Sequence, residues 1–226
     1  MTRNEIGRRR FAVGVGAGAV ALVGCHGEGE TCRGEIITPG EDLMGEHGIV
    51  RRIMVIWNEM GPRLRRGDTV DPQPLASSVD ALQWFIERYH ERTEEDEVFP
   101  RLERAGREVE LVRTLRHQHE VGRALSRELA GLLGHGIDET SRTRIADILA
   151  AHSRMYAAHA SREDTVIFPT LREIVGDDWV HLGREFDERE DHVIGAGGLE
   201  RALAQVEAVE SAYGIESLES FTPSIA

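Results

Sequence analysis

Residues 89–100 read YHERTEEDEVFP, and residues 158–169 read AHASREDTVIFP. The two segments align without a gap and share the pattern His-x-x-x-Glu, followed by Phe-Pro. Residues four apart on a helix lie one turn apart on the same face. Each copy therefore presents an imidazole and a carboxylate together, His90 with Glu94 and His159 with Glu163. The repeat predicts two helices that carry the same pair of side chains in the same arrangement.

A second match lies upstream of each copy. Residues 46–51 read EHGIVR and residues 118–123 read QHEVGR, so that His47 and His119 are each followed four residues later by an arginine. His117 competes with His119 for this role, but the trailing arginine and the match to His47 favour His119. Two helical hairpins with one histidine on the first helix and a His-Glu pair on the second are predicted.

The remaining chain also reads at helical period, and nothing resembles a run of alternating strands. Helices are predicted over about 41–60, ending at Gly61-Pro62, over 77–98, ending at Phe99-Pro100, over 108–133, and from 138 or 140 past 167. Short loops between them favour an antiparallel up-down four-helix bundle. One additional C-terminal helix is predicted over 179–212, with a weak point at 195–198. The fold class is all-α.

The N-terminus has the pattern of an export signal. Arg8-Arg9-Arg10-Phe11 precedes an uncharged stretch, 11–24, that is too short and too rich in glycine to span a bilayer stably. The arginines resemble the twin-arginine signature, whose pathway moves proteins already folded around their cofactors. The predicted organisation is a signal peptide over 1–24, a flexible tether over 25–41, a metal-binding bundle over 42–176, and a C-terminal helix and tail over 177–226.

Cys25 ends the apolar stretch, after Leu22-Val23-Gly24, as in the lipobox of bacterial lipoproteins. Its lipidation would anchor an exported, cell-envelope protein to a membrane. The alternatives are an uncleaved anchor, or a disulfide between Cys25 and Cys32 in an oxidising compartment. No cysteine follows Cys32, which excludes thiolate metal sites and thiol catalysis from the folded body.

Charge and motif content exclude several function classes. The net charge of −13 repels a phosphate backbone, and no basic cluster interleaved with aromatic residues follows the N-terminus, so nucleic-acid binding is not expected. The sequence has no flavin or haem motif, no nucleophile triad and no glycine-rich phosphate loop. An electron donor, if one is needed, must be a separate protein.

Antiparallel packing can bring the histidines and glutamates of the repeat to the bundle axis, where metal sites of this architecture lie. Two bare glutamates in a dry core would cost several kcal/mol for each charge, so cations are expected beside them. Four imidazoles and two carboxylates suit iron, and manganese is a second choice. The candidate ligands are His47, His90, Glu94, His119, His159 and Glu163.

The other histidines have simpler interpretations. A lone histidine or glutamate on a helix is usually a surface group or a satisfied core group, and only the repeated spacing makes the six candidates exceptional. His152 shares a face with His159 and is expected to be a core residue or an outer partner of the site. His181 and His192 are expected on the surface, and His26 and His135 in flexible stretches.

The constellation resembles the hemerythrin-like family, in the branch named for its His-His-Glu cation-binding domain, over about residues 42–176. The resemblance implies a non-haem centre of two iron ions held by the six candidates, with the glutamates as bridges. The dioxygen carriers of that family have a histidine where this chain has Glu163, which argues against reversible dioxygen carriage. Glu91 could add one oxygen ligand, although its counterpart in the repeat is Ala160.

Three classes of function follow. The first is redox chemistry on dioxygen, peroxide or nitric oxide, with a separate electron donor. The second is a binding or sensing module that takes iron or dioxygen without turnover. The third is a structural lipoprotein that retains a relic site. Turnover separates the first class from the second, and metal content separates both from the third.

Overall fold

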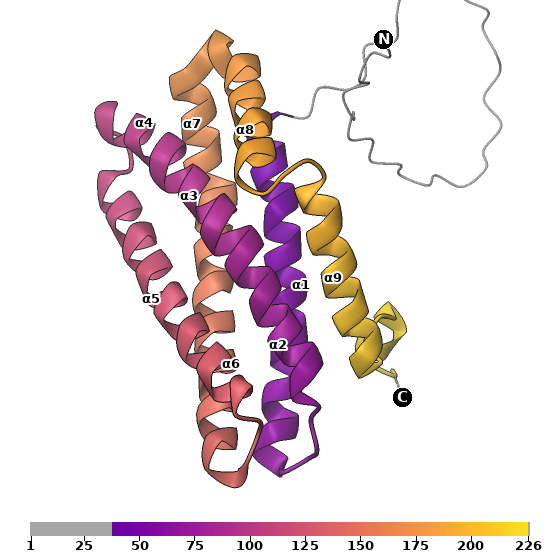
Figure 1. Cartoon of the computed structure of the whole chain (residues 1–226). Helices are drawn as coiled ribbons and strands as arrows, with labels where there is room; N and C mark the ends of the chain where they lie inside the picture. The colour runs from indigo at the N-terminus through magenta and orange to yellow at the C-terminus, as the bar shows by residue number, and fades with distance from the viewer. Residues whose placement is uncertain (1–37, 226) are drawn as a thin grey trace, which may run out of the picture. The chain divides into compact units, whose positions relative to one another are not determined.

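The computed structural model describes residues 38–225, which are almost entirely helical (Figure 1). The all-α prediction is confirmed, since this range contains helices and no strand. None of its helices combines the length and the apolar character that crossing a membrane requires. The predicted export signal and Cys25 lie outside the described residues.

Four helical rods form the body of the fold, followed by two shorter helices (Figure 1). The first rod is α1, the second runs from α2 to α4, the third is α5, and the fourth runs from α6 to α7. In chain order the elements are α1 (Pro39–Arg66), α2 (Pro72–Ala81), η1 (Leu82–His90), α3 (Glu91–Thr93), η2 (Glu94–Val98), α4 (Phe99–Arg104), α5 (Val109–Gly134), α6 (Glu139–Arg162), η3 (Glu163–Ile167), α7 (Phe168–Val175), η4 (Gly176–Asp178), α8 (Trp179–Val193), α9 (Gly198–Tyr213) and η5 (Leu218–Phe221).

Local signals explain where the first rod begins and ends. Thr38 and Glu41 form a capping box at the start of α1, and Gly67 closes the helix with a φ of 84°. The predicted end at Gly61-Pro62 is wrong, because α1 continues through Pro62 to Arg66. The burial of Leu64 beyond the proline offsets the backbone hydrogen bond that Pro62 cannot donate.

Wide π-helical turns occur at the same place in both copies of the repeat. Segment η2 begins at Glu94 and η3 at Glu163, and each is followed directly by Phe-Pro. In both, the carbonyl of the glutamate accepts a hydrogen bond from the N–H of the residue before the proline. The wider turn accommodates a proline that would crowd a regular helix, so the second rod continues to Arg104 instead of ending at Phe99. Such turns are frequent at functional sites.

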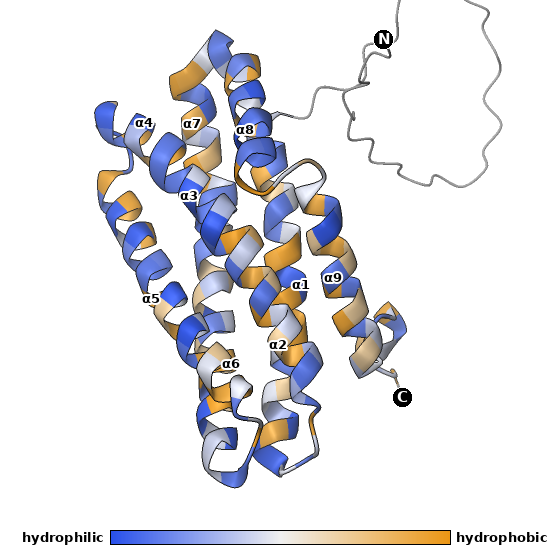
Figure 2. Cartoon of the chain, viewed as in Figure 1, coloured by the Kyte–Doolittle hydropathy of each residue, from blue (hydrophilic) through white to orange (hydrophobic). Residues whose placement is uncertain are grey.

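The rods alternate in direction in Figure 1, and α1 packs along α6 while α5 packs against both α2 and α6. Hydrophobic residues concentrate between the helices, and hydrophilic ones cover much of the outside (Figure 2). Two apolar clusters result, one around Trp57 and Phe85 and the other around Phe99 and Phe168. On each rod the candidate ligands lie between the parts that belong to these two clusters.

The C-terminal region differs from its prediction as one helix. Gly195 and Gly197 have φ values of 80° and 73°, so the chain turns there and α8 and α9 are separate helices. A Cβ atom on Gly198 would lie 2.3 Å from Ile194 Cδ1, which shows how tightly this turn is packed. Helix α9 packs against α2, α1 and η1, and the indole nitrogen of Trp84 in η1 donates to Gln205 at 2.9 Å.

Candidate metal centre

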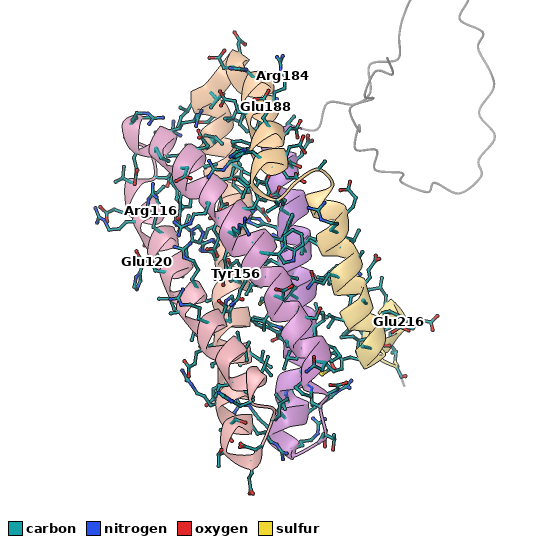
Figure 3. The ribbon with its side chains drawn as sticks, viewed as in Figure 1. Arg116, Glu120, Tyr156, Arg184, Glu188 and Glu216 are labelled. Atoms are coloured by element: carbon teal, nitrogen blue, oxygen red, sulfur yellow. The ribbon has the colours of Figure 1, made fainter. Side chains whose placement is uncertain are left out.

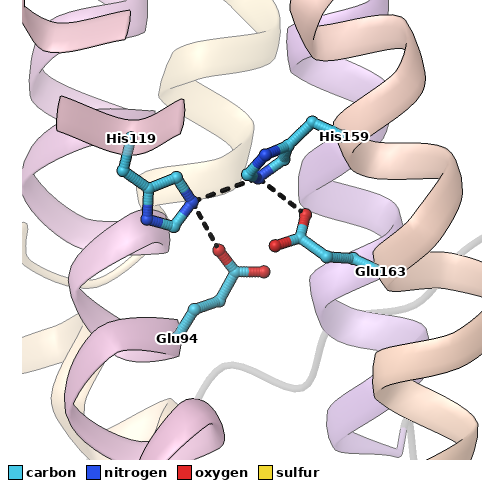
Figure 4. A group of neighbouring side chains, drawn as sticks. All are labelled: Glu94, His119, His159 and Glu163. Carbon is cyan, nitrogen blue, oxygen red and sulfur yellow. Dashed lines mark hydrogen bonds and ion pairs between the residues drawn. The ribbon is translucent and has the colours of Figure 1, made fainter. Parts of the chain in front are cut away.

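The structure brings all six candidate ligands together in the interior, and none is more than 2% exposed. Their donor atoms form two overlapping groups, and within each group the atoms lie within 4.8 Å of one another. The first group combines Glu94, His119, His159 and Glu163, as Figure 4 shows. The second combines His47, His90 and Glu94. Glu94 therefore belongs to both groups, each of which can hold a metal ion.

The four imidazoles are arranged as two pairs, with ring centroids 4.8 Å apart in both: His47 with His90, and His119 with His159. Glu94 places one oxygen 3.5 Å from His90 Nε2 and the other 3.4 Å from His119 Nε2. Glu163 Oε2 lies 3.4 Å from His47 Nε2 and 3.0 Å from His159 Nε2. Both carboxylates thus lie between the two pairs, where each can contact two cations.

The outward ring nitrogen, Nδ1, of every candidate histidine contacts a side-chain oxygen. Such a partner fixes the tautomer with the proton on Nδ1, so that Nε2 presents its lone pair to the centre. The Nε2 atoms of His119 and His159 lie 3.1 Å apart. A cation bound by both imidazoles would stabilise this close approach. The four contacts are His47 with Asp164 (2.7 Å), His90 with Glu46 (2.7 Å), His119 with Glu95 (3.0 Å) and His159 with Gln118 (3.0 Å).

These outer partners follow the symmetry of the repeat, and sequence reasoning missed them. Glu46 and Gln118 each precede the first histidine of a hairpin, and each contacts the histidine on the second helix of the same hairpin. Glu95 and Asp164 each follow a candidate glutamate ligand, and each contacts the first histidine of the other hairpin. The available signal was the presence of polar residues at matching flanking positions. All four contacts join two different helices, and two of them join different hairpins, so spacing along one helix does not reveal the pairing.

The repeated arginines, noted in the sequence without a role, support these partners. Arg51 pairs with Asp164. Arg123 donates to Glu95 at 2.9 Å and to Glu91 at 2.7 Å. Each arginine thereby holds the carboxylate that orients the histidine one turn before it.

The inner glutamates need a cation. Both oxygens of Glu94 and of Glu163 are buried without a hydrogen-bond partner among the described residues, as is His47 Nε2. Burial, with the nearby charges of Glu163 and Glu91, raises the pKa of Glu94 well above its usual value. Burial also opposes ionisation of Glu163, but His159 and His47 outweigh it and lower the pKa of that carboxyl group. Buried carboxylates without hydrogen bonds are costly, so the donor set of imidazoles and carboxylates fits metal ions.

The imidazoles differ electrostatically. Burial would lower the pKa of His47, but its hydrogen bond to Asp164 and the nearby charge of Glu163 outweigh it and raise the pKa to about 9. Burial lowers the pKa of His119 to about 4, despite its contact with Glu95. His119 is therefore ready to act as a neutral ligand at pH 7, whereas a metal must displace a proton from His47.

Glu91 lies outside the inner set. One of its oxygens accepts from Arg123 and the other from the Tyr156 hydroxyl, and Tyr156 lies between the rods in Figure 3. Burial raises the pKa of Glu91 to about 8. Its role as an additional ligand stays a prediction, since in this arrangement Glu91 contacts an outer arginine and a tyrosine.

The other described histidines lie outside both donor groups. His117, His135, His181 and His192 are exposed, and His26 lies outside the described residues. His152 is fully buried, meets Trp57 edge-on and stacks on Tyr156 with ring planes 1° apart. Neither of its ring nitrogens has a hydrogen-bond partner among the described side chains and backbone groups. His152 is therefore a core residue beside the centre and not part of either donor group.

His152 should make stability depend on pH. Burial lowers its pKa to about 4, whereas the unfolded chain binds this proton near the ordinary value of 6.5. The free energy of unfolding should therefore fall as the pH drops from 6.5 towards 4, by at most about 1.4 kcal/mol for each pH unit. We expect His152→Phe to reduce this slope, measured by urea unfolding of metal-free protein at pH 7, 6 and 5. His117→Phe, at an exposed site, is the control, and an unchanged slope in His152→Phe would contradict the prediction.

Comparisons with known proteins agree with this geometry. The model of the hemerythrin HHE cation-binding domain matches residues 38–175. An uncharacterised protein of Mycobacterium bovis and uncharacterised proteins of two Mycobacterium tuberculosis strains are each 35% identical over 221 residues. These alignments cover 92% of this chain and 87% of each relative. No solved structure matches.

Proposed function

The chain belongs to the hemerythrin HHE cation-binding family, and we propose that it holds two iron ions and uses them for redox chemistry on dioxygen, peroxide or nitric oxide. One observation carries the proposal: two buried glutamates without hydrogen-bond partners among the described residues lie between two histidine pairs whose outward nitrogens are already occupied. Manganese is the second candidate for the same donors.

We assign one ion to His47 and His90 and the other to His119 and His159, with Glu94 and Glu163 as shared ligands. The bound irons would supply electron transfer and a place for a small ligand to coordinate. The four rods are proposed to be the hemerythrin-like bundle that carries these ligands. Helices α8 and α9 are an addition that packs on it.

The chain's own residues exclude water from the centre and hold its protons. Phe168 stacks on His47 with ring centroids 5.5 Å apart, and Phe99 stacks on His119 at 5.7 Å. Both phenylalanines come from the Phe-Pro of the repeat, and each covers a histidine of the other hairpin. The outer carboxyl groups keep protons on Nδ1, so that the ring nitrogens facing the metals stay free to coordinate.

Glu163 favours redox chemistry over carriage. The dioxygen carriers among hemerythrin-like proteins have a histidine where this chain has Glu163. This chain therefore adds an anionic oxygen ligand to the centre. A more negative ligand set stabilises Fe(III) and lowers the reduction potential, which favours the reduction of a bound oxidant over its release.

The experiment is a measurement of peroxide consumption by protein purified without chelators and loaded with iron, with the metal-free protein as reference. We expect many peroxide molecules to be consumed for each chain, and none by the metal-free protein. His135→Ala, in a loop away from the centre, is the matched variant that should behave as the parent. If consumption stops at about one peroxide per iron, the chain is a non-catalytic binding or sensing module. If no iron binds, the centre is a relic.

We also propose that the chain is exported and anchored to a membrane by a lipid on Cys25. The support is the arginine run, the apolar stretch 11–24 and the small residues before Cys25. Membrane fractionation of a Cys25→Ser chain tests this part, since retention in the membrane fraction would point to an uncleaved anchor or a partner.

A further inference from the structure

The two halves of the centre are not equivalent, because the repeat is broken at one outer partner. His90 contacts the carboxyl group of Glu46 at 2.7 Å, whereas its counterpart His159 contacts the amide oxygen of Gln118 at 3.0 Å. His47 and His119 also have carboxyl partners. His159 is thus the one candidate ligand among the described residues whose outer contact is with a neutral group.

This difference bears on metal retention. A carboxylate that accepts from Nδ1–H makes the imidazole a stronger donor and adds negative charge close to the bound cation. An amide orients the ring but adds no charge. Loss of such an outer partner typically costs about 10- to 100-fold in metal affinity. The position shared by His119 and His159 should therefore hold its ion less tightly than the position shared by His47 and His90.

The same histidine also lies beside an opening. A surface cavity of about 330 Å³ lies between α5 and α6, and its lining includes Gln118 and His159 but none of the other five candidate ligands. Leu111, Leu115 and Ala158 supply apolar walls. His159 therefore has both the weaker outer contact and a position beside the surface cavity.

The rim of this cavity favours anions. Arg162 lines it, is exposed, and forms no ion pair with an acidic residue in the described part of the chain. An unpaired guanidinium attracts carboxylates and can bind them through two hydrogen bonds. Small chelating anions should accordingly enter here, although the chain as a whole is strongly acidic.

We propose that the His119–His159 position is labile, that small chelating anions reach it through the cavity between α5 and α6, and that Gln118 is the positioning residue that sets how fast its ion leaves. This inference rests on the proposed two-metal centre. It makes the chain a protein that keeps one ion and exchanges the other with anionic metal carriers.

The test uses protein loaded with cobalt(II), whose visible absorption reports bound metal, and dipicolinate as the chelating anion. We expect the absorption to decay in two phases of equal amplitude. Gln118→Glu should slow the fast phase about tenfold and leave the slow phase unchanged. Glu46→Gln should do the reverse and accelerate the slow phase by a similar factor. Gln73→Glu, at an exposed site on α2, is the control for the added charge.

The entry route has its own pair of variants. Ala158 lines the cavity and Ala157 does not, although both are exposed on α6. Ala158→Trp should slow the fast phase, and Ala157→Trp should leave it unchanged. Each of these variants, like Gln118→Glu and Glu46→Gln, is expected to change one phase at most. A general loss of stability would instead accelerate both phases together.

The possible outcomes distinguish a failure of the labile position from a failure of the two-metal centre. Two cobalt ions that leave in a single phase, or a fast phase that does not respond to Gln118→Glu, would overturn the inference and leave the two-metal centre standing. A parent chain that binds fewer than two ions refutes the proposed centre, and this inference with it.

Discussion

Glu94→Gln is expected to stabilise the metal-free protein and to weaken the metal-loaded one. In the metal-free chain Glu94 is fully buried, its oxygens lack hydrogen-bond partners among the described residues, and Glu163, Glu91 and Glu46 lie close enough to raise its pKa. The substitution replaces this ionisable group with a neutral amide of nearly the same shape. We expect the free energy of unfolding at pH 8 to rise by about 1 to 3 kcal/mol.

The gain should depend on pH in a defined direction. Because the pKa of Glu94 is raised by burial above the ordinary 4.5, the folded protein keeps a proton that the unfolded chain releases. The stability of the parent therefore falls as the pH rises above 4.5, and Glu94→Gln should remove this loss. At pH 4 the variant and the parent should have similar stability. Urea unfolding of metal-free protein across this range measures the difference.

The same substitution should release metal. An amide cannot replace a carboxylate that contacts two cations, so the iron content of Glu94→Gln should fall below that of the parent under identical loading. Glu120→Gln makes the same change of charge on α5, where Glu120 points outward in Figure 3, and should retain iron and stability. A variant that is less stable than the parent when metal-free, yet fully loaded with iron, would refute the roles given to Glu94.

Metal loading is the second change with a large expected effect. The folded chain brings six ligands together and the unfolded chain does not, so each ion stabilises the fold by mass action. At a free Fe(II) concentration about 100 times the dissociation constant, each ion should add about 2.7 kcal/mol to the free energy of unfolding. Since 1 kcal/mol corresponds to about 2–4 °C for a chain of this size, the melting temperature should rise clearly.

Anaerobic thermal unfolding with increasing Fe(II) measures this effect. Glu163→Gln loses one shared ligand and should show a smaller rise than the parent, whereas His181→Ala, at an exposed position on α8, should show the same rise. An identical melting temperature with and without iron would mean that the buried carboxylates do not bind it.

The repeat was the most informative part of the sequence. His-x-x-x-Glu places two donors on one helical face whatever the neighbouring helices do, and its recurrence made the convergence of His90, Glu94, His159 and Glu163 predictable. Their burial also followed, since each pair lies between apolar residues on the same rod. The all-α fold and the region matched by the family model were accessible for the same reason.

Other features depend on tertiary packing. The continuation of α1 through Pro62 depends on the burial of Leu64, which local preference does not report. The separation of α8 from α9 was visible only as a glycine-rich weak point, because the positive φ values become necessary when α9 packs on α2. Two of the outer partners, Asp164 for His47 and Glu95 for His119, come from the other hairpin and require the pairing of the rods.

We propose that Glu94 and Glu163 join two iron ions held by four histidines, and Mössbauer spectroscopy of protein loaded with iron-57 is the sharpest test of this claim. Together with metal analysis, the spectrum should show two irons for each chain and, in the oxidised protein, an antiferromagnetically coupled pair with a diamagnetic ground state. Glu120→Gln should give the same spectrum. A single iron for each chain, or two irons that give the magnetic spectrum of isolated high-spin Fe(III), would contradict the claim.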